Sequence, residues 1–272
     1  MPELPDAAGY RRLLARSLHR IEHVDLNDPE VLRNADRDAL DAAVGHQDVR
    51  SVERRGKWLV VRVDPSALLI HLGMTGELVL AARHEALDRA DRATLHGDVD
   101  IRLRDRRRLG GIWLAADADE IGAITGPLGA DAARLTLNQL RAGVGQRRMA
   151  IKTALTDQAA IAGLGNTLSD EILWVARLHP QTRADALSPE QLTGLHAALR
   201  DVVRRAARAG AIPRTPGWLT SQRGVPTPIC PRCHGTLRRS HVAGRAALWC
   251  PLCQPDGDVS VDRSDPSTQH GT

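Results

Sequence analysis

Short apolar runs separated by turn residues dominate the first half of the chain. Three of these runs occupy residues 58–63, 67–72 and 77–80. Asp64-Pro65, Gly73 and Gly76 break the runs apart, and residues 99–104 alternate apolar and charged positions. Such alternation is typical of a half-exposed strand, and short strands joined by tight turns favour an antiparallel sandwich or barrel. The pattern therefore predicts a β-rich region from about residue 21 to residue 114.

Helical periodicity flanks this β-rich region. Asp6 can cap a helix that runs to about Arg16 and has an apolar face containing Tyr10 and Leu14. Such a helix would fix the amino terminus against a folded body. A second helix is expected within residues 28–44.

The pattern changes after the segment Gly126-Pro-Leu-Gly129. Residues 135–208 are rich in Ala, Leu and Arg and are predicted to be helical. The segment Gly163-Leu-Gly-Asn166 interrupts this helical region, and His179-Pro180 is expected to end the helix that follows. Residues 211–228 are rich in Pro, Gly and Thr, which predicts a loop or linker.

These changes divide the chain into four predicted parts of an α+β protein. They are a β-sandwich domain at 1–127, a helical domain at 128–222, a cysteine module at 223–256 and a polar, disordered tail at 257–272.

Composition indicates an aliphatic core and a basic surface. The 272 residues include no Phe and one Tyr, so Leu, Val, Ile and Ala must fill the interior. A net charge of +4 and a pI near 9.2 favour a polyanionic partner without identifying it. Only two of the 37 basic residues are lysines, Lys57 and Lys152. Lysine loses its proton when buried, unlike arginine, so either these residues serve chemistry or they persist by chance.

No apolar run reaches the roughly 18 residues that a membrane-spanning helix needs. The start of the chain lacks the charged and apolar regions of a signal peptide. We therefore expect an intracellular protein without membrane contacts, whose thiols stay reduced. No pattern indicates self-association, and a monomer is expected.

Two Cys-x-x-Cys pairs are the most specific single signal. Cys230 and Cys233 form the first pair, Cys250 and Cys253 form the second, and sixteen residues separate the pairs. This spacing predicts one structural Zn²⁺ bound by four thiolates, whereas disulfides would fit poorly in a reducing compartment. The residues between the pairs predict a hairpin with Arg245 at or near its tip, where it could grip a phosphate or simply face solvent.

The amino terminus carries a second candidate for chemistry. Removal of Met1 would leave Pro2 as a free secondary amine beside the carboxylate of Glu3. An α-amine has a pKa of roughly 7.7–8.0, so much of it is unprotonated near neutral pH and can attack a carbonyl carbon. By itself this start can also have no significance, because many proteins begin with Met-Pro.

A series of short motifs in a fixed order adds to these separate signals. The series consists of Met1-Pro-Glu-Leu-Pro5, Arg54-Arg-Gly-Lys57, His71-Leu-Gly-Met-Thr-Gly76, Asp105 to Gly110, Gly163-Leu-Gly-Asn166 with Asp170-Glu171, Ala176-Arg-Leu-His-Pro180 and the double Cys-x-x-Cys. It closely resembles the formamidopyrimidine-DNA glycosylase and endonuclease VIII family across residues 2–254. The resemblance implies an amino-terminal antiparallel β-sandwich with flanking helices, and a helix–two-turn–helix domain that ends in a zinc finger.

The resemblance also implies roles for individual residues. Pro2 matches the nucleophile that attacks the sugar carbon C1′, and Glu3 matches its acid/base partner. Lys57 matches a lysine on a strand that contacts phosphate or assists near the lesion. Asn166 and Arg245 match residues that bind the phosphates flanking the flipped nucleotide. Arg245 is also expected to be one of the catalytic residues.

Four further residues are expected to touch DNA. Lys152 begins the helical element and is expected to contact the DNA backbone. Met74, Arg107 and Leu109 match the wedge that fills the space left by an everted base, although the last position is commonly aromatic in the family. The alternative is a core methionine beside a solvated arginine run.

Several positions depart from the family pattern. Asp6 stands where glutamate is usual and Ala7-Ala8 follows it, while Ala246-Ala247 replaces a more polar pair. The segment 211–227 lacks the Gly-Gly-Thr-Thr-like loop and the Tyr-Gly-Arg approach that cap an everted 8-oxoguanine. The missing loop favours an endonuclease VIII-like or unusual substrate over strict 8-oxoguanine specificity.

The sequence thus predicts a base-excision-repair enzyme, a bifunctional DNA glycosylase and AP lyase that acts through a Pro2 Schiff base. Its partner would be damaged double-stranded DNA, with single-stranded or bubble DNA as further options, in the nucleoid of the cytoplasm. The alternatives are a lesion- or structure-specific DNA-binding protein, or an AP lyase with little glycosylase activity. The damaged base, and whether the 5′ phosphate is eliminated after the 3′ phosphate, stay open.

Overall fold

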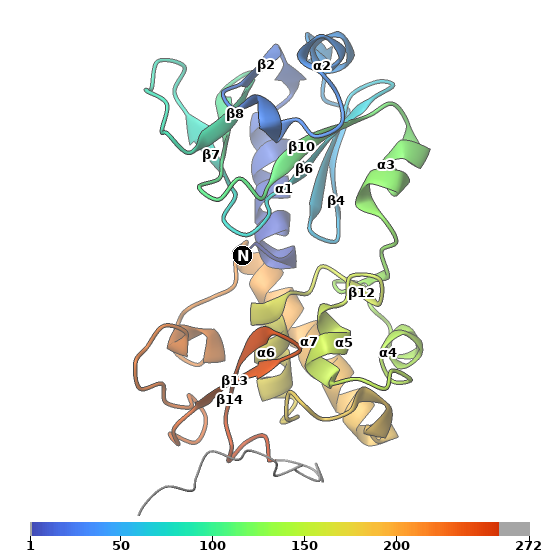
Figure 1. Ribbon diagram of the computed structural model, residues 1–272, viewed down its shortest axis with the longest axis vertical. Helices are drawn as coiled ribbons and strands as arrows, with labels where there is room; N and C mark the ends of the chain where they lie inside the picture. The colour runs from blue at the N-terminus through green and yellow to red at the C-terminus, as the bar shows by residue number, and fades with distance from the viewer. Residues whose placement is uncertain (1, 256–272) are drawn as a thin grey trace, which may run out of the picture.

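The computed structural model describes residues 2–255, and the predicted tail at 257–272 lies outside the described residues. Two four-stranded antiparallel sheets form the upper part of the molecule (Figure 1). The first has the order β10-β6-β5-β4 and contains β4 (Ser51–Arg55), β5 (Trp58–Arg62), β6 (Ala67–His71) and β10 (Gly111–Ala115). The second has the order β2-β8-β9-β7 and contains β2 (His23–Leu26), β7 (Glu77–Ala81), β8 (Asp91–His96) and β9 (Asp100–Arg104).

Alternate residues of both sheets pack into one shared aliphatic core, which includes Leu59, Ile70, Leu95 and Ile101. Because side chains alternate between the two faces of a strand, each sheet buries one face here. This packing confirms the predicted β-sandwich. The remaining elements of this part are β1 (Arg20–Ile21), η1 (Pro29–Val31), α2 (Arg37–Val44), β3 (Gln47–Asp48) and α3 (Ala118–Thr125).

Helix α1 (Leu4–Ser17) joins the sandwich to the lower, helical part of the molecule (Figure 1). The expectation that Asp6 caps this helix is wrong. Glu3 is the N-cap, and Asp6 accepts the Glu3 N–H at 2.8 Å from the third helical position, as in a capping box. Leu14 packs in the sandwich core, whereas Leu4 packs in the core of the helical part. The amino terminus is therefore held by both halves of the protein.

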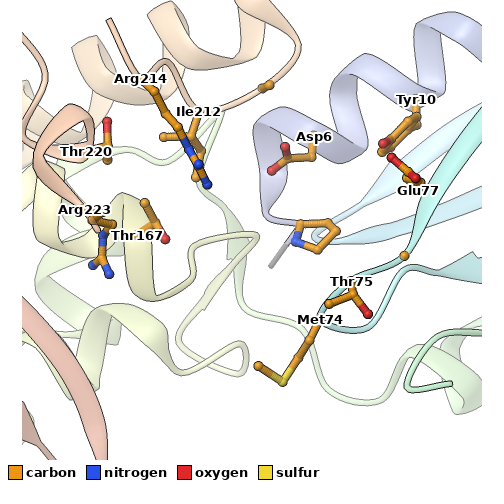
Figure 2. A pocket seen from close by; sticks show the side chains of 13 residues that line it. Asp6, Tyr10, Met74, Thr75, Glu77, Thr167, Ile212, Arg214, Thr220 and Arg223 are labelled. Carbon is orange, nitrogen blue, oxygen red and sulfur yellow. The ribbon is translucent and has the colours of Figure 1, made fainter. Parts of the chain in front are cut away.

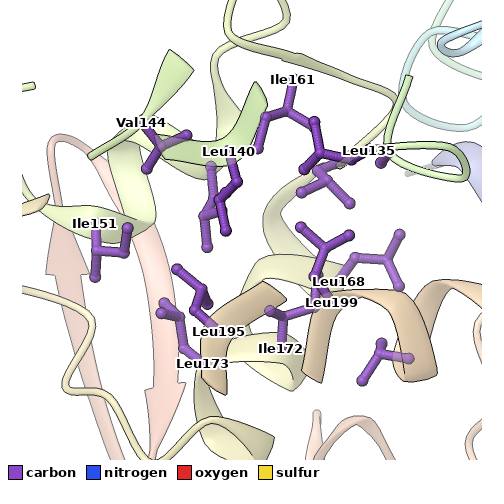
Figure 3. Close-up of a cluster of buried hydrophobic side chains, with 14 of the residues drawn as sticks. Leu135, Leu140, Val144, Ile151, Ile161, Leu168, Ile172, Leu173, Leu195 and Leu199 are labelled. Atoms are coloured by element: carbon purple, nitrogen blue, oxygen red, sulfur yellow. The ribbon is translucent and has the colours of Figure 1, made fainter. Parts of the chain in front are cut away.

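The helical part is built around a second aliphatic core (Figure 3). Its elements are β11 (Ala130–Asp131), α4 (Leu137–Gly143), α5 (Ile151–Thr156), β12 (Ile161–Ala162), α6 (Asn166–Val175), η2 (Ala184–Ala186), α7 (Pro189–Ala209) and η3 (Leu219–Gln222). Leu168 and Ile172 of α6 meet Leu195 and Leu199 of α7 in this core. Helix α6 ends at Val175, four residues before the His179-Pro180 signal that was expected to end it.

The long helix α7 has clear start and stop signals. Ser188 caps it with a capping box to Gln191, and Gly210 ends it in the left-handed conformation with φ 79°. A Cβ atom on Gly9 of α1 would lie 2.4 Å from the Gly210 carbonyl oxygen. The end of α7 can therefore approach α1 this closely only because residue 9 is glycine.

The last described element is the hairpin of β13 (Arg238–Val242) and β14 (Arg245–Trp249). Ala243 and Gly244 form its two-residue turn with φ 47° and φ 75°. Arg245 is the first residue of β14, directly after the turn, as the sequence predicts. None of the described helices is long and apolar enough to span a membrane.

Candidate active site

The amino terminus lies in a pocket of about 330 Å³ between the two halves of the protein (Figure 2). Pro2 lines this pocket, and the N–H of Leu4 donates to the Gly163 carbonyl at 3.0 Å. This bond ties the start of α1 to the turn that precedes α6. Pro2 is thus held at a cavity and not on a free chain end.

Glu3 is fully buried, and its carboxylate accepts three backbone N–H groups at the start of α6. The donors are Gly165 at 2.7 Å, Thr167 at 2.8 Å and Leu168 at 3.1 Å. A Cβ atom at position 165 would lie 2.4 Å from the Glu3 carboxyl carbon, so the approach requires glycine. The amino end of a helix is a ready anion site, and here an acidic side chain of the same chain occupies it.

Burial raises the pKa of the Glu3 carboxyl above its ordinary value, while Lys57 and the three N–H groups oppose that shift. Burial lowers the pKa of Lys57, Glu3 opposes this shift and the charge of Arg245 adds to it. The charges of Glu3 and Arg245 therefore both act on Lys57. Burial shifts each member of the Glu3–Lys57 pair towards its neutral form, as a pair that exchanges protons requires.

His71 at the end of β6 lies close enough to Lys57 to feel its charge. Burial, with a further contribution from Lys57, lowers the pKa of His71 to about 4, so the ring is neutral at neutral pH. Its Nδ1 accepts the Gly73 N–H at 3.2 Å, and its ring lies 4.8 Å from that of Trp58. The motif series contained His71, but only the fold shows that it lies beside Lys57.

The pocket wall is built from four segments that are distant in sequence (Figure 2). Its residues include Asp6 and Tyr10 of α1, Met74, Thr75 and Glu77 around the start of β7, Thr167 of α6, and Ile212, Arg214, Thr220 and Arg223 from the loop after α7. Sequence reasoning missed Arg214 and Arg223. They are the only charged residues of the segment 211–228, a signal that could have identified them.

Two of the predicted wedge residues, Met74 and Arg107, meet at the pocket rim. The Nη1 atom of Arg107 lies 3.5 Å from the Met74 sulfur, and Leu109 follows in the same loop. The side chains of Met74 and Leu109 are 41% and 48% exposed, so neither is a core residue. Asp105 holds the loop by accepting the N–H groups of Arg107, Leu109 and Gly110 at 3.1, 2.8 and 2.7 Å.

The structure contradicts the expected DNA contact of Lys152. This side chain is fully buried and forms an ion pair with Asp170. Asp170 also pairs with Arg223 and accepts the Leu248 N–H of β14 at 3.0 Å. A buried ammonium needs a counter-charge, and Lys152 finds it in an internal network that joins α5, α6, the pocket loop and the hairpin.

Asn166 is the first residue of α6, and its main-chain oxygen accepts from Lys152 and Arg223 at 3.3 and 3.4 Å. Its side-chain Oδ1 is buried and has no hydrogen-bond partner within residues 2–255. The Asn166 amide is therefore held in place by its backbone while its side chain keeps unused hydrogen-bonding capacity.

The four cysteines converge at the open end of the hairpin, because two of them precede β13 and two follow β14. The sulfurs of Cys230 and Cys253 lie 3.9 Å apart, and those of Cys233 and Cys250 lie 3.4 Å apart. A tetrahedral zinc site with Zn–S bonds of about 2.3 Å places sulfurs about 3.8 Å apart. The Trp174 Nε1–H also donates to the Cys230 sulfur at 3.3 Å. This donor set fits one structural zinc ion, which would clamp the hairpin that carries Arg245.

Comparison with known proteins agrees with this geometry. Residues 1–112 match the family model of the formamidopyrimidine-DNA glycosylase N-terminal domain, and residues 127–215 match that of the formamidopyrimidine-DNA glycosylase H2TH domain. The formamidopyrimidine-DNA glycosylase of Acidothermus cellulolyticus is 34% identical over 281 residues, which covers 94% of this chain and 98% of the relative. That of Thermomicrobium roseum is 36% identical over 298 residues and covers 94% and 99%.

Solved structures give the same result. The Lactococcus lactis Fpg in complex with DNA containing an abasic site superposes with a TM-score of 0.84 at 26% identity, covering 93% of this chain and 100% of that chain. The same enzyme in complex with DNA containing N7-benzyl-Fapy-dG gives a TM-score of 0.84 at 26% identity and covers 94% and 100%. With two family models, full-length relatives and a shared fold, the chain belongs to the formamidopyrimidine-DNA glycosylase family of base-excision-repair enzymes.

Proposed function

We propose that this protein excises a damaged base from DNA and then cleaves the strand at the resulting abasic site, with Pro2 as the nucleophile. The observation that carries the proposal is the position of Pro2, in a pocket and directly before a buried carboxylate fixed by three N–H groups. A protein that only bound DNA would need neither a proline amine at a cavity nor a buried acid beside it.

The chemistry follows from the amine that Pro2 presents once Met1 is removed. The Pro2 nitrogen forms a bond to C1′ of the damaged nucleotide while the bond from C1′ to the base breaks, and the base leaves with a proton. Opening of the sugar ring gives an iminium ion between Pro2 and C1′. The iminium acidifies C2′, so that loss of a C2′ proton expels the 3′ phosphate.

Glu3 and Lys57 are proposed to move the protons in these steps. Burial raises the pKa of Glu3 and lowers the pKa of Lys57, so each group is shifted towards the form in which it can give or take a proton. Arg245, close enough to lower the pKa of Lys57, is placed to hold a phosphate beside the same nucleotide.

Recognition of DNA is assigned to groups around this pocket. Met74, Arg107 and Leu109 form an exposed wedge that can enter the stack when a nucleotide is everted. Asn166 and Arg245 are proposed to bind the flanking phosphates. Zinc, bound by the four cysteines, would supply a rigid support for the hairpin that presents Arg245.

For the damaged base, the proposal names a chemical class and not an individual base. The curated relatives are named for formamidopyrimidine, and one related structure holds DNA with N7-benzyl-Fapy-dG. The endonuclease VIII-like preference inferred from the loop 211–227 stays a prediction. Arg214 and Arg223 in that loop support an oxidised base whose oxygens accept hydrogen bonds from guanidinium groups. Excision assays with oxidised purines and oxidised pyrimidines in matched oligonucleotides measure this preference.

Borohydride trapping on DNA with an abasic site tests the mechanism. The full-length protein without Met1 should form a covalent adduct, whereas Pro2→Gly and a chain with an amino-terminal extension should form little or none. An undiminished adduct with both variants would exclude Pro2 as the nucleophile. Tight, salt-sensitive binding without any adduct from the unaltered protein would instead support a non-catalytic DNA-binding protein.

A further inference from the structure

A second cluster of metal-binding side chains lies on the outer face of the sheet β2-β8-β9-β7. His23 and Asp25 are two residues apart on β2, and His96 of β8 is the register partner of His23. The intervening Val24 and the neighbouring Leu95 face the sandwich core. Alternation therefore places His23, Asp25 and His96 together on the opposite, outward face.

The three residues offer ligand atoms that all lie within 4.8 Å of one another. The imidazole rings of His23 and His96 are stacked with their centroids 4.2 Å apart. Ligand atoms around a tetrahedral zinc ion are about 3.4 Å apart, given bonds of about 2.0–2.1 Å. His23 is exposed, so its ring can turn its nitrogen towards the other two ligand atoms.

His96 shows why a cation fits between these groups. Its Nδ1 lies 2.9 Å from the Asp100 carboxylate and its Nε2 lies 3.1 Å from the Asp25 carboxylate. Asp100 is buried, whereas the Asp25 side chain is 49% exposed. The Nε2 atom of His96 and the Asp25 carboxylate are therefore the pair of groups that can receive an ion from solvent.

A metal ion between Nε2 of His96 and the Asp25 carboxylate would use both groups as ligands. The ring of His23 supplies a third ligand atom next to them. In protein zinc sites, the ring nitrogen of a ligating histidine that does not bind the metal usually forms a hydrogen bond to a carboxylate or carbonyl. The contact between Nδ1 of His96 and Asp100 has this arrangement.

We propose that His23, Asp25 and His96 form a second metal site, which takes a divalent ion of the zinc type while Asp100 orients the His96 ring. Two imidazoles and one carboxylate suit zinc and its neighbours in the transition series. The site has three protein ligands and faces solvent, so water completes the coordination. Figure 1 shows β2 and β8 at the end of the molecule opposite β13 and β14, far from the four-cysteine cluster.

Bound metal is counted on the untagged, full-length protein after equilibration at micromolar free Zn²⁺. The unaltered protein should hold two zinc ions per chain, and His96→Ala and Asp25→Asn should each hold one. His84→Ala, which removes an exposed histidine from a loop, is the matched control and should keep two. Asp100→Asn should keep the second ion with about 10- to 100-fold weaker affinity.

Two further measurements complete the test. Co²⁺ in the second site should show visible absorption without the thiolate charge-transfer band expected of the four-cysteine site. Abasic-site cleavage by His96→Ala should equal that of the unaltered protein, which shows that the variant is folded. One zinc ion per chain in the unaltered protein, or a second ion retained in both ligand variants, would overturn the proposal.

Discussion

Replacement of Glu3 by glutamine tests the centre of the proposed site. The carboxylate accepts Gly165 and Leu168 on one oxygen and Thr167 on the other. A glutamine that keeps its oxygen toward Gly165 and Leu168 turns its NH₂ group toward the Thr167 N–H, so two donors face each other. One buried N–H is then left without an acceptor, at a cost of about 1–3 kcal/mol.

The variant also loses a group that can gain and release a proton. General acid–base catalysis contributes roughly 10²–10⁴-fold to a rate. Glu3→Gln should therefore fold with a free energy of unfolding lowered by about 1–3 kcal/mol, and its single-turnover base excision should fall by at least ~100-fold. Cleavage of a preformed abasic site should fall less, because no base has to leave.

Asp117→Ala provides the matched control. Asp117 accepts the N–H groups of Asp119 and Glu120 at the start of α3, at 2.9 Å each, and α3 does not contribute to the pocket. Its removal should cost about 1 kcal/mol of stability and leave excision unchanged. If Glu3→Gln excised bases at the rate of the unaltered protein, the assignment of Glu3 as the acid/base group would be refuted.

Three further outcomes are expected. Asp170→Asn leaves Lys152 buried without a counter-charge, so urea denaturation should show a loss of about 3–5 kcal/mol, against less than about 1 kcal/mol for Asp201→Asn at a half-exposed ion pair. Met74→Ala should slow excision from duplex DNA more than cleavage of single-stranded abasic DNA; equal slowing would contradict a wedge. Burial raises the pKa of Glu171 from 4.5 to about 7, so between these values the unfolded chain releases the proton first and stability falls as pH rises. Between pH 4.5 and about 7, the unaltered protein should lose about 3 kcal/mol of unfolding free energy relative to Glu171→Gln. If the unfolding free energies of the two proteins changed with pH in the same way, the raised pKa of Glu171 would be contradicted.

Local sequence patterns predicted those structural features whose physical cause acts over a few neighbouring residues. Apolar runs ended by Asp64-Pro65 and Gly73 predicted β5 and β6 closely, because side-chain alternation and turn residues act over a few positions. The spacing of the cysteine pairs predicted a convergent thiol cluster for the same reason. The resemblance then placed Pro2 and Glu3 at the reacting centre, and the fold puts Pro2 at a pocket.

Only the tertiary structure decided which charged groups meet. Lys152 was expected at the DNA surface, but its position at the start of α5 turns it inward to Asp170, a contact that no local pattern encodes. Arg214 reaches the pocket because α7 packs on α1 and returns the following loop to the amino terminus. His23 and His96 are 73 residues apart in sequence and meet through strand register alone. Sequence determined the elements and the chemical groups available, whereas burial and long-range pairing determined which groups share a site, because desolvation and charge pairing act through space and not along the chain.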